Sequence, residues 1–152
     1  MKAFTENLHR LEVLNPQWTD KLNHWQNLLY AQGEEVYREN KEEFKEFYKE
    51  QEYEYEQIFL YFIFGYLSGS VYDNNAYDKV RFALVNTLLI RELDLAEWLS
   101  HHKKLDFDQQ VDLVHSFARE LEHSDPNLEE MELMISYEEE YVLEDLLCWI
   151  WN

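Results

Sequence analysis

The sequence predicts an all-α fold, a single compact bundle of about six helices over residues 1–152. The chain contains only 3 Gly and 2 Pro, too few turn residues for an all-β domain. Apolar residues make up 46% of it, including 5 Trp, 11 Tyr and 9 Phe, which is enough to build a sizeable core. Apolar positions also recur at three- and four-residue steps, the spacing of one helix face.

Two short helices are expected at the N-terminus. In the first, apolar residues recur from Phe4 to Leu14 at helical spacing. Asn15 and Pro16 then form a break, with Asn15 expected as the N-cap and Pro16 at the first helical position. The second helix has its apolar face from Trp18 onward and is expected to end at Gly33.

The middle of the chain is expected to hold the core. Residues 34–56 include ten Glu and four Lys or Arg, which indicates a long solvated helix with a narrow aromatic stripe. Residues 58–71 are apolar on nearly all sides, and residues 76–99 hold a long apolar run. Helices with this pattern are typical of a core, so we expect the bundle to be built around these two segments.

The C-terminal third contains two clear helix starts. Asp106 followed by Gln109 resembles a capping box, and the next helix has its apolar face from Phe107 to Leu121. Residues 124–126 (SDP) end that helix and start another. No Lys or Arg occurs from Glu120 to the C-terminus. The sequence contains no repeat and no linker long enough to divide the chain.

The charge balance excludes several partners. The chain has 13 Lys and Arg against 32 Asp and Glu, a formal net charge of −19. Nucleic acid and anionic membrane surfaces repel such a protein, whereas a basic or lysine-bearing protein surface attracts it. The longest apolar run, residues 58–67, is well short of the ~20 residues of a membrane span.

The sequence predicts no cofactor. One cysteine, Cys148, permits neither an intrachain disulfide nor a cysteine-based cluster, and no glycine-rich phosphate loop is present. Residues 1–13 have no signal-peptide core, so we expect a cytoplasmic protein. No nucleophile–base arrangement occurs, so no catalytic residue is predicted and the chain is not expected to be an enzyme by itself.

Two Glu-x-x-His pairs, Glu6 with His9 and Glu120 with His123, have the spacing used in carboxylate-bridged metal sites. A complete site also needs two inward carboxylates from other helices, for which Glu92 and Glu97 are the best candidates. A carboxylate-bridged metal-binding helical protein is therefore one alternative, although matches by chance are expected among so many acidic residues.

The remaining polar candidates form a predicted structural cluster. Its members are Arg81, Arg91, Glu92, Arg119, Glu120, Glu122 and His123. Arginines within apolar helical runs usually pair with carboxylates. We therefore expect Arg91 or Arg81 to reach Glu122 or Glu120 across two packed helices and to set the helix register.

Several segments, taken in order, resemble the C-terminal helical region of the flagellin lysine-N-methylase family. They are residues 11–18 (LEVLNPQW), 53–56 (YEYE) with 59–62 (FLYF), 80–83 (VRFA) with 89–93 (LIREL), and 116–124 (SFARELEHS). The resemblance covers roughly residues 8–130. The last twenty or so residues have no counterpart in it.

Members of this family transfer methyl groups from S-adenosylmethionine to flagellin lysines, and carry an N-terminal cysteine-rich segment for an iron–sulfur cluster. This chain lacks those cysteines. The resemblance therefore implies S-adenosylmethionine and an iron–sulfur cluster only for a full-length member of the family. It implies here a non-catalytic accessory or C-terminal domain that docks flagellin or braces a catalytic part. A stand-alone acidic interaction module is the other alternative that the sequence leaves open.

Overall fold

The computed structural model describes residues 1–151, apart from the side chains of Asp73, Glu140 and Trp151. The regular elements of these residues are all helical, which confirms the all-α class, and the helices are more numerous than predicted. They are α1 (Lys2–Asn7), α2 (Trp18–Tyr30), α3 (Glu34–Tyr48), α4 (Tyr53–Tyr66), α5 (Ser70–Asp73), α6 (Ala76–Ser100), α7 (Phe107–Glu122), α8 (Asp125–Tyr137) and α9 (Leu143–Trp151), with short 3-10 turns at Leu8–Arg10, Lys49–Gln51, Leu67–Gly69 and Glu139–Tyr141.

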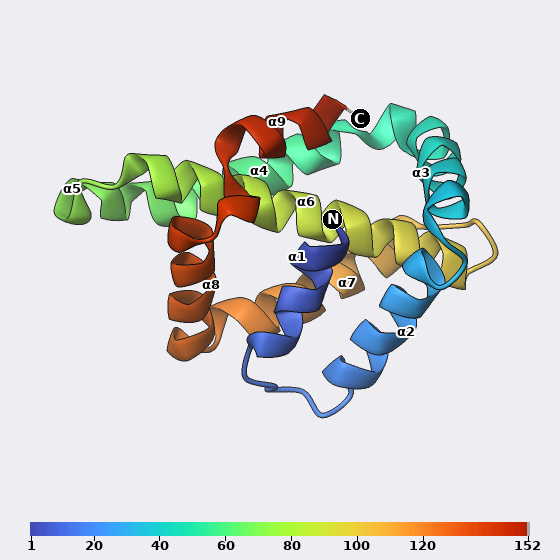
Figure 1. Cartoon of the computed structure of the whole chain (residues 1–152), viewed down its shortest axis with the longest axis horizontal. Helices are drawn as coiled ribbons and strands as arrows, with labels where there is room; N and C mark the ends of the chain where they lie inside the picture. The colour runs from blue at the N-terminus through green and yellow to red at the C-terminus, as the bar shows by residue number, and fades with distance from the viewer. Residues whose placement is uncertain (152) are drawn as a thin grey trace.

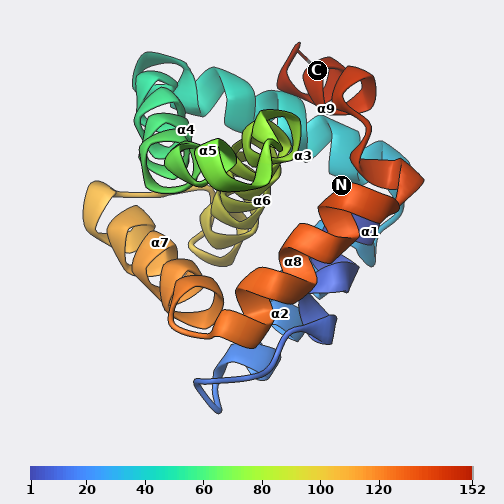
Figure 2. The same ribbon diagram turned by 90° about the vertical axis from the view of Figure 1, so that its left-hand side faces the viewer.

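Helix α6 is the axis of the fold. It contacts α2, α3, α4, α7, α8 and α9, which surround it when the molecule is viewed near its axis (Figure 2). Residues 81–90 of α6 are buried without interruption, because neighbours cover every side of the helix. The prediction that residues 76–99 form a core helix is confirmed.

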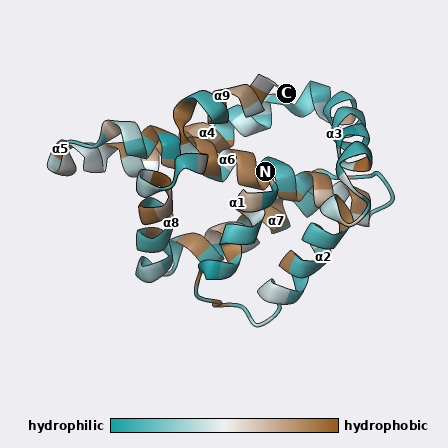
Figure 3. Ribbon diagram, in the orientation of Figure 1, coloured by the Kyte–Doolittle hydropathy of each residue, from teal (hydrophilic) through white to brown (hydrophobic). Residues whose placement is uncertain are grey.

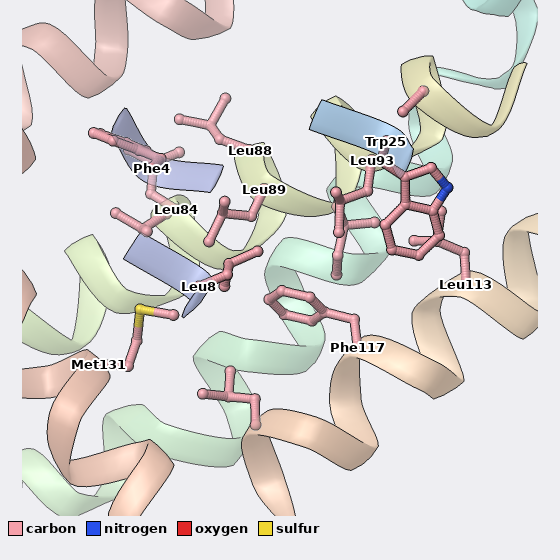
Figure 4. Packing of buried hydrophobic residues seen from close by; sticks show 14 of the residues in the cluster. Phe4, Leu8, Trp25, Leu84, Leu88, Leu89, Leu93, Leu113, Phe117 and Met131 are labelled. Carbon is pink, nitrogen blue, oxygen red and sulfur yellow. The ribbon is translucent and has the colours of Figure 1, made fainter. Parts of the chain in front are cut away.

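The core is a single cluster of apolar side chains from almost every helix. Figure 4 shows Leu84 and Leu89 of α6 packed among Leu8 of the 3-10 turn after α1, Phe117 of α7 and Met131 of α8. Apolar positions along the ribbons therefore lie mainly toward the centre of the molecule (Figure 3). Burying an aliphatic or aromatic side chain of this kind contributes about 1.5–3 kcal/mol.

The prediction that residues 58–71 form a second central helix is wrong. Helix α4 contacts α6 along one side, where Phe62 is buried, but no described part of the chain covers its opposite side. Phe64 is 81% exposed, and Tyr72 in α5 is 91% exposed. The α4–α5 end also extends furthest from the rest of the molecule in Figure 1. Apolar residues on all sides of this helix therefore mark an exposed apolar face.

Three helix boundaries depart from the sequence pattern. Helix α2 begins at Trp18 rather than Pro16, because the Asn15 side chain accepts the Gln17 amide in a preceding turn, at 3.0 Å. Residues 34–56 form two helices, since α3 ends at Tyr48 and α4 begins at Tyr53. Helix α2 ends at Tyr30 rather than at Gly33. Gly33 lies directly before α3 with φ 93°, a backbone conformation that favours glycine.

The capping box at the start of α7 is confirmed. Asp106 Oδ1 accepts the Gln109 amide at 2.9 Å, and Gln109 Oε1 accepts the Asp106 amide at 2.9 Å. This cap fixes the direction in which α7 leaves the preceding loop, and Phe107 follows it directly.

Candidate functional site

The predicted structural cluster does not assemble in one place. Arg81 bonds to Asp78 one turn earlier in α6 and to the Tyr141 carbonyl at 3.1 Å. Arg91 donates to the Ile150 carbonyl at 3.4 Å. Among the contacts of the described residues neither arginine reaches Glu120 or Glu122, so the predicted bridge is wrong. The two arginines lie ten residues, or about 2.8 turns, apart on α6 and contact different neighbours.

Glu120 and Glu122 accept other donors. The two oxygens of buried Glu120 accept the backbone amides of Leu14 and Asn15, each at 2.8 Å. Glu122 accepts the hydroxyls of Tyr61 and Tyr66 of α4 at 2.8 and 2.9 Å. These two carboxylates therefore attach the loop before α2 and helix α4 to the end of α7. Their neighbours Arg119 and His123 are exposed.

The first metal-candidate pair lies at the surface. Glu6 forms an exposed ion pair with Lys2 at 3.7 Å, and His9 Nε2 lies 2.9 Å from Gln26 Oε1. Across the described residues, no group of three or more His, Cys, Asp or Glu side chains has the arrangement needed to hold a metal ion.

The supplementary carboxylates of α6 are likewise occupied. Buried Glu92 accepts the hydroxyls of Tyr30 and Tyr37 at 2.7 and 3.1 Å. Glu97 accepts the indole N–H of Trp25 at 2.7 Å. Burial raises the pKa of Glu92, while the two tyrosine hydroxyls act in the opposite direction. These bonds attach α2 and α3 to α6.

Asp94 is a third carboxylate on α6, and it is fully buried. Its Oδ2 accepts the Tyr55 hydroxyl and the Gln110 amide, both at 2.9 Å, while its Oδ1 has no partner among the described residues. Burial raises the pKa of Asp94 to about 7, with a further contribution from Glu54 and Glu97. The Gln110 side chain that it holds faces a hollow on the surface.

That hollow has a volume of about 310 Å³ and lies between the end of α3, the start of α4 and the start of α7. We call it the aromatic cleft. Its lining residues are Phe47, Tyr48, Gln51, Tyr53, Glu54, Leu105, Asp106, Phe107 and Gln110. The lining combines four aromatic rings with two carboxylates, and no described lysine or arginine side chain is part of it. Aromatic faces and carboxylates together attract organic cations.

The lining of the cleft is held in place. The Tyr48 hydroxyl donates to Glu54 Oε2, and the Tyr53 hydroxyl lies 3.4 Å from Oε1 of the same carboxylate. Asp94 fixes the Gln110 amide from below, and Asp106 is fixed by its capping box. A site with a carboxylate positioned before the ligand arrives loses less conformational entropy on binding.

A second hollow of about 340 Å³ adjoins the cleft. The two share Tyr53, Glu54, Phe107 and Gln110, and the second continues over apolar residues of α7 such as Val111. Together they form a depression with a charged part and an apolar part. Its lining suits a peptide that carries a cationic side chain next to an apolar one.

A family model, the FliB lysine N-methylase C-terminal domain, matches residues 1–149. The chain belongs to this family. The match extends past residue 130, so the prediction that the last twenty or so residues have no counterpart is wrong. Comparisons with curated proteins and with solved structures gave no match. No helix among the described residues of this FliB C-terminal domain is long and apolar enough to cross a membrane.

Two sequence segments that carry the family resemblance meet in this FliB C-terminal domain. Residues 11–18 form the loop whose amides bond to Glu120 of residues 116–124. The adjoining Asn127 bonds to both the amide and the carbonyl of Glu12, at 2.6 and 2.8 Å. The roles seen for these segments are therefore structural.

The sequence pattern does not predict the aromatic cleft. It places Tyr53 in the aromatic stripe of a helix over residues 34–56, and Phe107 on the apolar face of a helix over residues 107–121. The sequence signal that could indicate these two residues is that each one lies at a helix start beside a carboxylate. Nothing in the sequence indicates that these two starts, more than fifty residues apart, lie together.

Proposed function

We propose that this domain is a non-catalytic docking module of a flagellin lysine methylase system, and that its aromatic cleft receives a lysine side chain of flagellin. Methyl transfer then takes place on a separate catalytic part. Membership of the lysine N-methylase family supports a lysine-bearing partner. The composition of the cleft, four aromatic rings and two carboxylates without a cation, is the observation that carries the proposal.

The surroundings of the cleft favour the same partner. Exposed glutamates follow the outer side of α3 toward the cleft, among them Glu39, Glu42, Glu46 and Glu50. Lys49 lies 3.7 Å from Glu46 and offsets part of this charge. With a net charge of −19, the whole chain attracts a basic segment over distances of about one Debye length, ~10 Å at moderate salt.

Binding of purified flagellin, measured by calorimetry with the intact chain, tests the proposal. Glu54→Gln keeps an oxygen for the Tyr48 hydroxyl but removes the charge, so we expect affinity to fall about tenfold. Glu129→Gln, an exposed position on α8, is the matched control and is expected to bind as the parent does. Equal affinity for parent and Glu54→Gln contradicts the proposal.

The exposed apolar face of α4–α5 favours bracing of a catalytic part as a second role. Leu60, Phe64, Val71 and Tyr72 are exposed on this face, and residues 57–72 carry no charged side chain. Apolar patches of this kind are typical of protein contacts. If this face meets the catalytic part, Phe64→Ser weakens that association and leaves flagellin binding by the cleft unchanged.

A further inference from the structure

We infer that the aromatic cleft selects methylated lysine over unmodified lysine, and so holds the product of the methyl transfer. This inference rests on the proposed docking function and specifies which form of the side chain the same cleft prefers. It follows from three features of the lining: the state of its acceptors, the amount of aromatic surface and the absence of a described lysine or arginine side chain from it.

Part of the acceptor capacity of the two cleft carboxylates is already used. Tyr48 and Tyr53 donate to the two oxygens of Glu54, and Asp106 Oδ1 accepts the Gln109 amide. An unmodified lysine ammonium brings three N–H donors that each need an acceptor. Each methyl group removes one donor but leaves the positive charge, so methylation reduces the number of acceptors that the ligand demands.

The aromatic surface suits the methylated form. Phe47, Tyr53 and Phe107 are 43%, 58% and 67% exposed, so their rings are available to a ligand. Methylated ammonium groups spread their charge over apolar methyl groups, which pack against ring faces and lose little hydration. Recognition of such ammonium groups by several aromatic rings is a recurrent use of cation–π attraction.

No described lysine or arginine side chain lines the cleft, and Lys103, two residues before the lining residue Leu105, is engaged elsewhere. Lys103 forms an ion pair with Glu43, and its Nζ lies 5.4 Å from the Trp98 ring centroid. It does not line the cleft. The lining therefore contains two carboxylates and no described lysine or arginine, so a cationic ligand can supply the opposite charge.

Four amino-acid probes test the inference on the intact chain. They are Nα-acetyl-lysine methylamide with no, one and three methyl groups on the ammonium, and an uncharged tert-butyl analogue of the trimethylated form. Titrations followed by NMR give the dissociation constants. We expect the trimethylated probe to bind roughly tenfold more tightly than the unmodified one, and the uncharged analogue to bind more weakly than the trimethylated one.

Phe107→Ala is expected to abolish the preference for methylated lysine. It removes an exposed ring, so folding is expected to be unaffected, and Tyr137→Ala, at an exposed aromatic of α8, is the matched control. Equal or tighter binding of the unmodified probe, or binding of no probe, overturns the inference. If flagellin still binds through Glu54 in that case, the docking function stands and only the selectivity is wrong.

Discussion

At the residue scale, tyrosine hydroxyls supply donors that buried carboxylates need. Tyr30 and Tyr37 donate to Glu92, and Tyr55 donates to Asp94. With 13 basic against 32 acidic residues, the chain has too few arginines and lysines to pair every carboxylate. A phenol hydroxyl brings a donor together with a large apolar ring, so it can enter the core where an ammonium group cannot.

Asp94→Asn is expected to reduce the dependence of stability on pH. The native pKa of about 7 lies above the ordinary 3.8, so the contribution of protonated Asp94 is complete below pH 3.8 and is lost as pH rises through about 7. Between pH 5 and pH 8 this loss amounts to about 3 kcal/mol. An asparagine places an uncharged amide in the same position. Because this amide does not titrate, the variant does not show this loss of stability.

Urea unfolding of parent and Asp94→Asn at pH 5 and pH 8 measures this effect. The variant is expected to be the more stable protein at pH 8, with the difference shrinking or reversing at pH 5. Identical pH dependence of the two proteins would show that Asp94 does not titrate in this range.

Glu120→Ala is expected to lower the free energy of unfolding by about 2–4 kcal/mol, because the amides of Leu14 and Asn15 lose their acceptor. Glu129→Ala, at an exposed position of α8, controls for the change in net charge. Chemical denaturation measures both, and an equal effect of the two substitutions would contradict the role of Glu120 as acceptor for the Leu14 and Asn15 amides.

At the element scale, the two sides of α4 are expected to respond differently to the same substitution. Phe62 is 1% exposed and packs against Phe82 of α6, so Phe62→Ala is expected to cost about 3–5 kcal/mol of stability. Phe64→Ala, on the exposed side, is expected to change stability by less than about 0.5 kcal/mol. Thermal unfolding distinguishes them, and similar losses would mean that another part of the chain covers Phe64.

The sequence pattern of an apolar helix does not predict whether the helix is buried on all sides. Residues 58–71 are apolar on nearly all sides and residues 76–99 hold a long apolar run, yet only the second segment is a core helix. Hydrophobic periodicity depends only on the residues of the helix itself and not on how many other helices pack against it. It therefore cannot distinguish a central helix from one with an uncovered face. The cap at Asp106 was predictable because its two partners lie three residues apart.

The polar contacts were less predictable for a related reason. Arginine–carboxylate pairing is the common solution for buried charge, but Glu122 is bonded by Tyr61 and Tyr66, some sixty residues away in the chain. The aromatic cleft likewise forms only because α3, α4 and α7 all pack on α6. Both depend on tertiary geometry that residue spacing does not contain.

At the scale of the whole molecule, salt is expected to act in opposite directions on folding and on binding. Screening weakens repulsion among the acidic side chains of a chain of net charge −19, so thermal stability is expected to rise with salt. Flagellin binding is expected to weaken over the same range, because electrostatic attraction contributes to it. Thermal melts and calorimetry at low and high sodium chloride measure the two, and binding unaffected by salt would exclude a charge-driven partner.

Chemical-shift mapping of the ¹⁵N-labelled chain with flagellin tests the central claim most directly. The docking account predicts that the largest shifts occur at the amides of residues 47–54 and 105–110 and at the Gln110 side chain, with little change along α8. Shifts confined to α4–α5 or to α8, with the residues of the aromatic cleft unaffected, would contradict it.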